Sequence, residues 1–415
     1  MPNVDDDHPD SSRVGPPVGR GLAALLLLAF ALRLGWLWLC PNQPVSDQSV
    51  YHQAAIAIAH GNGFVEPDGR PHGWWPVGYS AAMAPFYWLL GDSPRSGHVA
   101  NLLFGVALVA AVFRLAFALF GRRAAWLAGL LAAVNPTAVL MTTVLALENL
   151  YAPLVIGALA ILVGGARAAG PTWRRVAAVG VLLGLSAYVR APALLLLVAI
   201  PCWALANGRG WLRAVGYGAA AAALALLVLV PWGLRTKACF GTFQLVSMNG
   251  MSNLWMGNHP GTDGGYHGLP ADVASLTIPE RERELGARAI AFIVEQPGQY
   301  LQNCLRRVVM TLRSDTIAVG WNETGLAARG LQSLSMPLKL LTSGTFFLVG
   351  AAAIWSCWRR RRDLGRADLL LALVLAVLAF PFVAIVGGNR YHLPMAPVLW
   401  VLVAAVRRDR LPHAP

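Results

Sequence analysis

Long apolar runs separated by short polar segments dominate the chain. About 20 apolar residues cross the hydrocarbon core of a bilayer as a helix, and runs of roughly 15 to 22 residues fit that length. Arg190 and Pro192 split one long stretch into two short runs. The pattern predicts an all-α polytopic membrane protein with about ten transmembrane helices. These are expected near residues 21–40, 98–119, 124–142, 148–165, 176–190, 191–207, 214–232, 338–357, 367–387 and 392–406.

Basic residues lie in the short connectors between these runs, and this position decides how the net charge of +13 is interpreted. In a soluble protein that charge would suggest a nucleic-acid partner, but arginines beside apolar runs are a topology signal, so no nucleic acid is expected. With ten spans they all fall on one side, which the positive-inside rule makes cytoplasmic, together with both termini. They are Arg122, Arg123, Arg167, Arg174, Arg175, Arg209, Arg213, residues 359–362, Arg366, Arg407, Arg408 and Arg410.

The polar segments divide the chain into five parts. A disordered cytoplasmic tail is expected over 1–20, and a cytoplasmic tail over 407–415. A transmembrane catalytic module is expected over 21–232, with its first outer loop at 41–97. An outer segment with amphipathic helices follows at 233–335, and C-terminal transmembrane helices at 336–406.

Two stretches outside the spans look helical. The stretch 76–91 is apolar and aromatic but short for a span, which favours an interfacial helix. The stretch 280–313 is amphipathic, and Arg306, Arg307 and Arg313 are expected to face lipid headgroups.

The five cysteines form no CxxC pair and no metal-ligand spacing. Only Cys239 and Cys304 could meet outside the membrane, and their pairing stays open. The first apolar run lacks a small-residue cleavage site, so we interpret it as a retained anchor.

Ionisable residues are rare at the span centres, where they would mark an ion path. Arg33 and Arg114 lie inside apolar runs but within about two turns of an interface, so both are expected to snorkel. Most other polar groups gather where runs meet the outer face. They are Asp47, Tyr51, His52, Glu148, Arg190, Arg235, Lys237, Arg390, Tyr391 and His392.

This polar set suits a reaction on an amphiphilic substrate with a phosphate at headgroup level. Cations neutralise the charge of a departing phosphate, and a carboxylate accepts the proton of an attacking hydroxyl. With enough Arg and Lys, neither a metal nor another cofactor is required, although a divalent ion stays possible.

Structural roles explain the same residues individually. Asp47 could be the N-cap of a helix beginning near Gln48, and Glu148 a solvated acid in a first helical turn. Arg190 and Arg390 could anchor to headgroups, and Tyr391 could belong to an aromatic belt.

The order of the motifs resembles a known family. "SDQSVYHQ" follows the first span, then come "WWPVGYS", "LALENLY", "GLSAYVRAP", "PWGLRTK", "NLWMGN" and "GGNRYHLP". Over residues 20–406 this order is similar to bacterial polyprenyl-phosphate-dependent glycosyltransferases of the GT-C superfamily. The nearest branch includes protein O-mannosyltransferases and the lipid A aminoarabinose transferase.

The resemblance implies an inverting sugar transfer from a polyprenyl-phosphate donor at the periplasmic face of the bacterial inner membrane. Asp47 matches the catalytic base. Substrate contacts are expected from Tyr51, His52, Glu148, Arg190 and Asn258, and contacts to the lipid phosphate from Arg235, Lys237, Arg390 and Tyr391. The acceptor stays open among a glycolipid, a cell-envelope polymer and a protein.

One departure from the family weakens this assignment, and two other functions compete with it. Relatives often have Asp-Glu where this chain has Asp47-Gln48, so a second acid would come from Glu148 or Glu66. A transporter or lipid flippase would show internal repeats and polar groups at mid-membrane, and neither is evident. A membrane scaffold would leave the gathered polar groups unexplained.

Overall fold

The computed structural model describes residues 18–164 and 170–408, and within them the all-α expectation is confirmed. The acidic N-terminal tail, Arg167 and Arg410 lie outside the described residues. The helices are α1 (Val18–Leu39), α2 (Asp47–Ala59), α3 (Gly78–Leu90), α4 (Pro94–Phe120), α5 (Arg122–Val134), α6 (Pro136–Leu140), α7 (Glu148–Val163), α8 (Trp173–Val189), α9 (Ala199–Ala206), α10 (Trp211–Phe240), α11 (Gly250–Gly257), α12 (Ile278–Glu295), α13 (Pro297–Leu312), α14 (Ile317–Gly320), α15 (Glu323–Ala327), α16 (Ser335–Arg359), α17 (Arg366–Ala384) and α18 (Ala396–Ala404).

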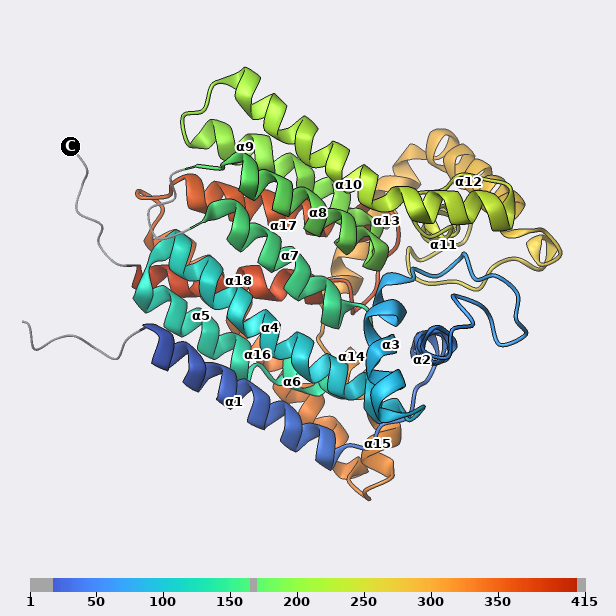
Figure 1. Ribbon diagram of the computed structural model, residues 1–415, viewed down its shortest axis with the longest axis horizontal. Coiled ribbons are helices and arrows are strands. Elements are labelled where there is room, and N and C mark those ends of the chain that lie inside the picture. Colours follow the sequence, from blue (N-terminus) through green and yellow to red (C-terminus); the bar gives the residue numbers. More distant parts are fainter. Residues whose placement is uncertain (1–17, 165–169, 409–415) are drawn as a thin grey trace, which may run out of the picture.

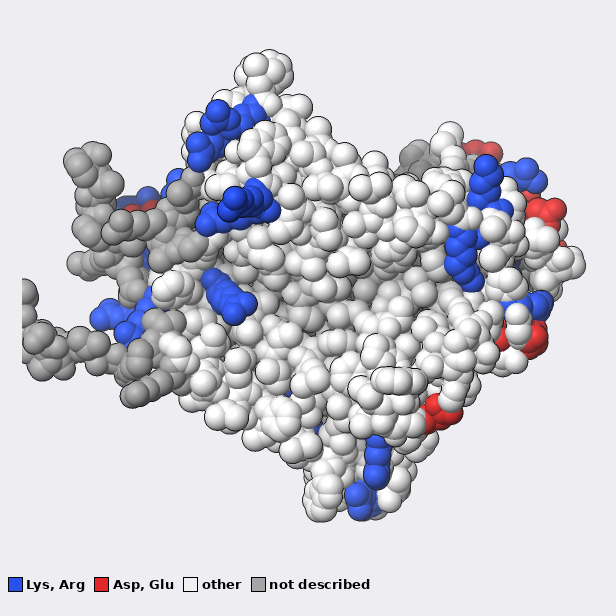
Figure 2. Space-filling view, in the orientation of Figure 1, with Lys and Arg blue, Asp and Glu red and all other residues white. Residues whose placement is uncertain are grey.

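The long helices run side by side along one axis of the molecule (Figure 1). The helices α2, α3, α11 and α12 lie together at one end, which we call the outer end. Figure 2 shows mainly Lys and Arg at the opposite end and both signs of charge around α12 at the outer end. This distribution agrees with the basic connectors lying on one side, and the cytoplasmic assignment of that side stays a prediction.

Every one of the ten expected runs is mostly helical, but fewer qualify as spans. Five helices are long and apolar enough to cross a membrane: α1, α4, α10, α16 and α17. A sixth is possible if α5 and its continuation Pro136–Thr143, bent by 51° at Asn135, form one broken span. Shorter apolar helices cover Glu148–Val163, Ala191–Ala206 and Leu393–Arg407. The chain is therefore a multi-pass membrane protein, and the count of ten stays a prediction.

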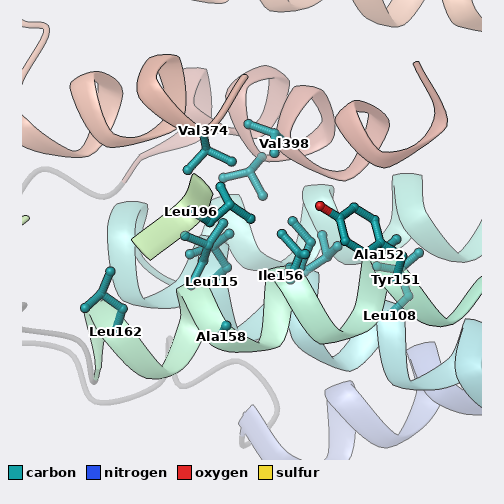
Figure 3. Close-up of a cluster of buried hydrophobic side chains, with 14 of the residues drawn as sticks. Leu108, Leu115, Tyr151, Ala152, Ile156, Ala158, Leu162, Leu196, Val374 and Val398 are labelled. Atoms are coloured by element: carbon teal, nitrogen blue, oxygen red, sulfur yellow. The ribbon is translucent and has the colours of Figure 1, made fainter. Parts of the chain in front are cut away.

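The core lies between α4, α7, α17 and α18, where aliphatic side chains interdigitate (Figure 3). Small residues allow close packing elsewhere. Gly180 and Gly184 of α8 lie against α10, and a Cβ on Gly180 would come within 2.6 Å of the Ala221 carbonyl oxygen. This is the small-xxx-small geometry by which membrane helices pack backbone to backbone.

Arg33 does not snorkel, because its side chain is fully buried. It donates to the carbonyl oxygens of Ala132 and Ala133, both at 3.2 Å, at the C-terminal end of α5. The last carbonyls of a helix have no partner within the helix and carry partial negative charge. Arg33 thus stabilises the break between α5 and α6 from the first span.

Arg307 does not face lipid headgroups either, because it is fully buried on α13. Its guanidinium donates to the carbonyls of Val383 and Gly257, both at 2.8 Å, at the ends of α17 and α11. Cys304 also contacts it, through Sγ at 3.1 Å from Nη2. Cys304 and Cys239 are both free thiols, so the disulfide between them that the sequence left open is not formed.

The polar face of α13 is buried and its apolar face is exposed. Asn303, Arg307 and Thr311, four residues apart, are fully buried, whereas Leu301, Leu305 and Val309 are more than half exposed. The amphipathic helix expected from the sequence is present, but oriented with its polar stripe inward.

The Arg307→Lys variant should lower the free energy of unfolding by about 3 kcal/mol, because a lysine cannot reach both helix ends and buried carbonyls lose charged donors. Thermal unfolding of the purified protein in detergent measures this change. Arg306→Lys is the matched control, since Arg306 is the exposed neighbour. Equal unfolding midpoints for the two variants would contradict the assigned role.

Candidate active site

Asp47 and Arg390 form an ion pair at the outer end of the bundle. Asp47 is the first residue of α2, and its Oδ2 accepts a hydrogen bond from Nη1 of Arg390 at 2.5 Å. The two residues are 343 positions apart in the chain, and their side chains are 17% and 26% exposed. The N-cap interpretation of Asp47 is wrong, because Ser46 holds the cap position and the carboxylate faces Arg390.

Glu148 and Arg190 form a second ion pair, with 3.3 Å between Oε1 and Nη1. Glu148 opens α7 and Arg190 ends α8. The Glu148 side chain is only 4% exposed, so the solvated interpretation is wrong. Its second oxygen, Oε2, has no hydrogen-bond partner within the protein.

Tyrosine rings connect the two ion pairs. The Tyr391 ring lies under both guanidinium groups, 5.1 Å from Arg190 and 5.5 Å from Arg390. Tyr51 is buried, and burial raises its pKa well above the usual value, with a further rise caused by Asp47. Tyr51 therefore remains a neutral phenol beside the charges. Asp47, Arg390, Glu148, Arg190, Tyr51 and Tyr391 together are called the paired-charge cluster.

The segment around Asp47 is held in a strained turn. Ser46 has φ 52° and ψ −128°, a backbone conformation that residues other than glycine rarely adopt. The next residue after Asp47, Gln48, is buried, and its side-chain oxygen accepts a hydrogen bond from the Leu145 backbone at 3.1 Å. The neutral Gln48 side chain thus ties α2 to the segment before Glu148.

Of the two alternative acids, the structure brings Glu148 and not Glu66 into the paired-charge cluster. Glu66 lies in the first outer loop, with Oε1 3.7 Å from Nδ1 of His72. Glu148 is consequently the acid available beside Asp47.

The turn carrying Arg390 is fixed by the segment that follows α11. Asn258 donates to the Ile385 carbonyl at 3.1 Å, and the amide of Gly387 donates to the Gly264 carbonyl at 2.9 Å. Asn258 is fully buried, so it supports this turn and presents no surface to a substrate. The sequence did not single out this supporting role.

Three other expected site residues have different surroundings. Nδ1 of His52 lies 2.7 Å from the Tyr87 hydroxyl, and burial lowers the pKa of this histidine. Arg235 donates to the carbonyls of Phe64 at 2.6 Å and His72 at 2.9 Å, and its guanidinium stacks over Trp232. Lys237 is exposed near the end of α10. Arg235 therefore holds the first outer loop, and these contacts do not join it to the paired-charge cluster.

Metal ligands do not gather in the part of the chain that the structure describes. No group of three or more His, Cys, Asp or Glu side chains there could hold a metal ion. The charges of the paired-charge cluster balance one another directly as carboxylate and guanidinium.

Comparison with known proteins gives one family match and several related folds. The family described as dolichyl-phosphate-mannose-protein mannosyltransferase matches residues 75–234. A search of curated proteins found no match to this chain.

Two solved structures share the fold of nearly the whole chain. The oligosaccharyltransferase AglB from Archaeoglobus fulgidus, in complex with an inhibitory peptide and a dolichol-phosphate, is 15% identical with a TM-score of 0.53. ArnT from Cupriavidus metallidurans, bound to undecaprenyl phosphate, is 15% identical with a TM-score of 0.54. The matches cover 94% and 95% of this chain, but only 50% of AglB and 60% of ArnT. At this identity the likeness establishes the fold.

Acidification should destabilise the first outer loop through His72. Burial, with a smaller contribution from Arg235, lowers the pKa of His72 to about 4. An unfolded histidine has a pKa of about 6.5, so the stability present above pH 6.5 is lost as the pH falls toward 4, by about 3 kcal/mol in total.

Thermal unfolding in detergent at pH 7.5 and pH 4.5 tests this expectation. His72→Asn cannot titrate there and keeps the backbone carbonyl that Arg235 uses. The variant should therefore lose less stability than the wild type between the two pH values. The same loss in both proteins would rule out His72 as the cause.

Proposed function

We propose that this chain is a glycosyltransferase of the GT-C superfamily and transfers a sugar from a polyprenyl-phosphate donor. The family match and the shared fold support this assignment. The acceptor carries a hydroxyl or amine, and the reaction takes place at the outer, extracytoplasmic end of the bundle. The lipid phosphates bound to AglB and ArnT support this class of donor.

The single observation that carries the proposal is the paired-charge cluster. Four distant segments bring two carboxylates and two guanidinium groups to one end of a bundle of apolar helices. Placing charges at such a site costs free energy, and groups retained there are commonly functional. A carboxylate for proton transfer and cations for a leaving phosphate are the two requirements of sugar transfer from a lipid phosphate.

Binding of the donor requires an exchange of partners. Arg390 and Arg190 are both paired with carboxylates, so a phosphate that binds Arg390 competes with Asp47 for the guanidinium. The phosphate takes over the contact of Arg390, and the Asp47 carboxylate is released toward the acceptor. The base is therefore free when the donor is in place.

The reaction is a single displacement at the anomeric carbon. The acceptor oxygen or nitrogen attacks this carbon as Asp47 takes its proton, and the bond between the carbon and the phosphate oxygen breaks. The electron pair leaves with the lipid phosphate, whose charge Arg390 and Arg190 neutralise. Attack opposite the leaving group inverts the anomeric configuration, as in inverting glycoside hydrolysis.

The Asp47→Asn variant should lower kcat by about 10²- to 10⁴-fold, the usual contribution of a general base. Purified protein is incubated in detergent with radiolabelled polyprenyl-phosphate sugars and a panel of envelope acceptors, and free polyprenyl phosphate is measured. Asp92→Asn is the control, because Asp92 is an exposed acid that pairs with His60. Near-normal turnover by Asp47→Asn would contradict the assignment of Asp47 as the base. If the wild type releases no lipid phosphate, a transporter is favoured instead.

The Arg390→Ala variant should bind undecaprenyl phosphate about tenfold more weakly, because a charged hydrogen bond to the phosphate is lost. Asp47→Asn should bind it at least as tightly as the wild type, since the competing carboxylate is gone. Equilibrium binding of the radiolabelled lipid phosphate measures both. Weaker binding by Asp47→Asn would contradict the exchange of partners.

A further inference from the structure

A buried acid and a buried histidine lie directly behind the paired-charge cluster. His392 is two residues after Arg390, and its Nε2 lies 3.3 Å from Oδ1 of Asp315. Their side chains are 1% and 6% exposed. Neither residue contacts Asp47, and the proposed reaction does not use them.

The contacts of His392 fix the orientation of its imidazole ring. Nδ1 of His392 lies 3.1 Å from the Thr311 carbonyl oxygen, which only accepts, so Nδ1 carries a proton. Nε2 therefore faces the Asp315 carboxylate across the 3.3 Å contact.

Asp315 is anchored from other elements. Its Oδ2 accepts a hydrogen bond of 2.5 Å from the Thr137 hydroxyl of α6, and its backbone amide donates to the Ser343 hydroxyl of α16. The Phe346 ring of α16 also packs against His392, with 4.5 Å between the ring centroids. The pair therefore connects the turn before the last apolar helix to α6, α13 and α16.

A cavity of about 70 Å³ adjoins the pair. Its lining includes Arg33 from α1 and Glu148 from α7, in addition to Asp315 and His392. One polar atom on each of these four residues has no hydrogen-bond partner within the protein: Arg33 Nε, Glu148 Oε2, Asp315 Oδ1 and His392 Nε2. Buried polar atoms without partners are costly, and a cavity of this size has room for water molecules that could satisfy them.

His392 is rigidly linked to Arg390. The amide of Leu393 donates to the Arg390 carbonyl at 3.1 Å, which closes a turn around Tyr391 and His392. Movement of the imidazole would therefore move the guanidinium that faces Asp47.

We propose that Asp315 and His392 are positioning residues, which hold Arg390 and Tyr391 where a lipid phosphate binds. The pair acts through the backbone turn and touches neither the sugar nor the phosphate. This inference rests on the proposed function, because it assumes that Arg390 receives the phosphate of the donor.

A double-mutant cycle with undecaprenyl phosphate binding as the readout tests the pair. Asp315→Asn keeps the volume and the acceptor for Thr137 but removes the charge, and it should weaken binding about tenfold. In the Arg390→Ala background the same substitution should change binding less than about twofold, because the contact that it positions is gone. Asp92→Asn, which removes the acid of an exposed acid–histidine pair, should leave binding unchanged.

Each outcome of the cycle has a separate meaning. Equal weakening by Asp315→Asn with and without Arg390 would overturn the positioning role, as would a lower unfolding temperature with unchanged binding. If Arg390→Ala itself binds undecaprenyl phosphate normally, the proposed function fails instead.

Two gentler substitutions apply if Asp315→Asn does not fold. Thr137→Val removes one hydrogen bond to Asp315, and His392→Asn keeps a donor toward Thr311 while losing the contact to Asp315. Both should weaken binding in the wild-type background and not in the Arg390→Ala background. Unchanged binding by both folded variants would overturn the proposal.

Discussion

The pairing of Asp47 with Arg390 organises the outer end of the molecule. Both groups are mostly withdrawn from water, where an unpaired charge is costly, so each needs the other in place. One comes from the segment after the first span and the other from the turn before the last apolar helix. The ion pair therefore joins two segments that lie near opposite ends of the sequence. The ion pair of Glu148 and Arg190 joins α7 to the end of α8 in the same way.

Buried cations without acidic partners support this end of the fold. Arg33 and Arg307 are fully buried and bind helix C-terminal carbonyls, whose partial negative charge replaces a carboxylate. Arg307 joins the ends of α11 and α17, and α17 leads into the turn of Arg390. The position of Arg390 thus depends on a second cation that contacts no carboxylate among the described residues.

The sequence predicts the members of the paired-charge cluster better than their surroundings. Counting apolar runs places Asp47, Glu148, Arg190 and Arg390 at one end. The chain crosses the membrane once in each run, so every second connector lies on the same side. The expectations that Arg33 snorkels and that Arg307 faces lipid headgroups were wrong. Periodicity shows that a helix has two faces, but not which face is buried when lipid, and not water, can cover the apolar one.

The sequence also did not predict the partners of individual buried polar side chains, for a similar reason. Asn258 and His52 lie in the same motifs as expected site residues, yet the fold turns both side chains inward. The partner of a buried polar group depends on tertiary packing, which spacing along one chain does not encode. The four-residue spacing of Asn303, Arg307 and Thr311 places them on one face of α13, and only the fold shows that this face is buried.

The balance of charge in the cluster has a consequence for the proposed reaction. Two carboxylates and two guanidinium groups sum to zero, so a lipid phosphate that enters adds negative charge beside Asp47 and Glu148. The same phosphate withdraws Arg390 from Asp47. Both changes leave the Asp47 carboxylate without the cation that neutralises it in the free protein. In the proposed reaction, binding of the donor therefore frees Asp47 for the acceptor, which couples activation of the acceptor to the presence of the sugar that it will receive.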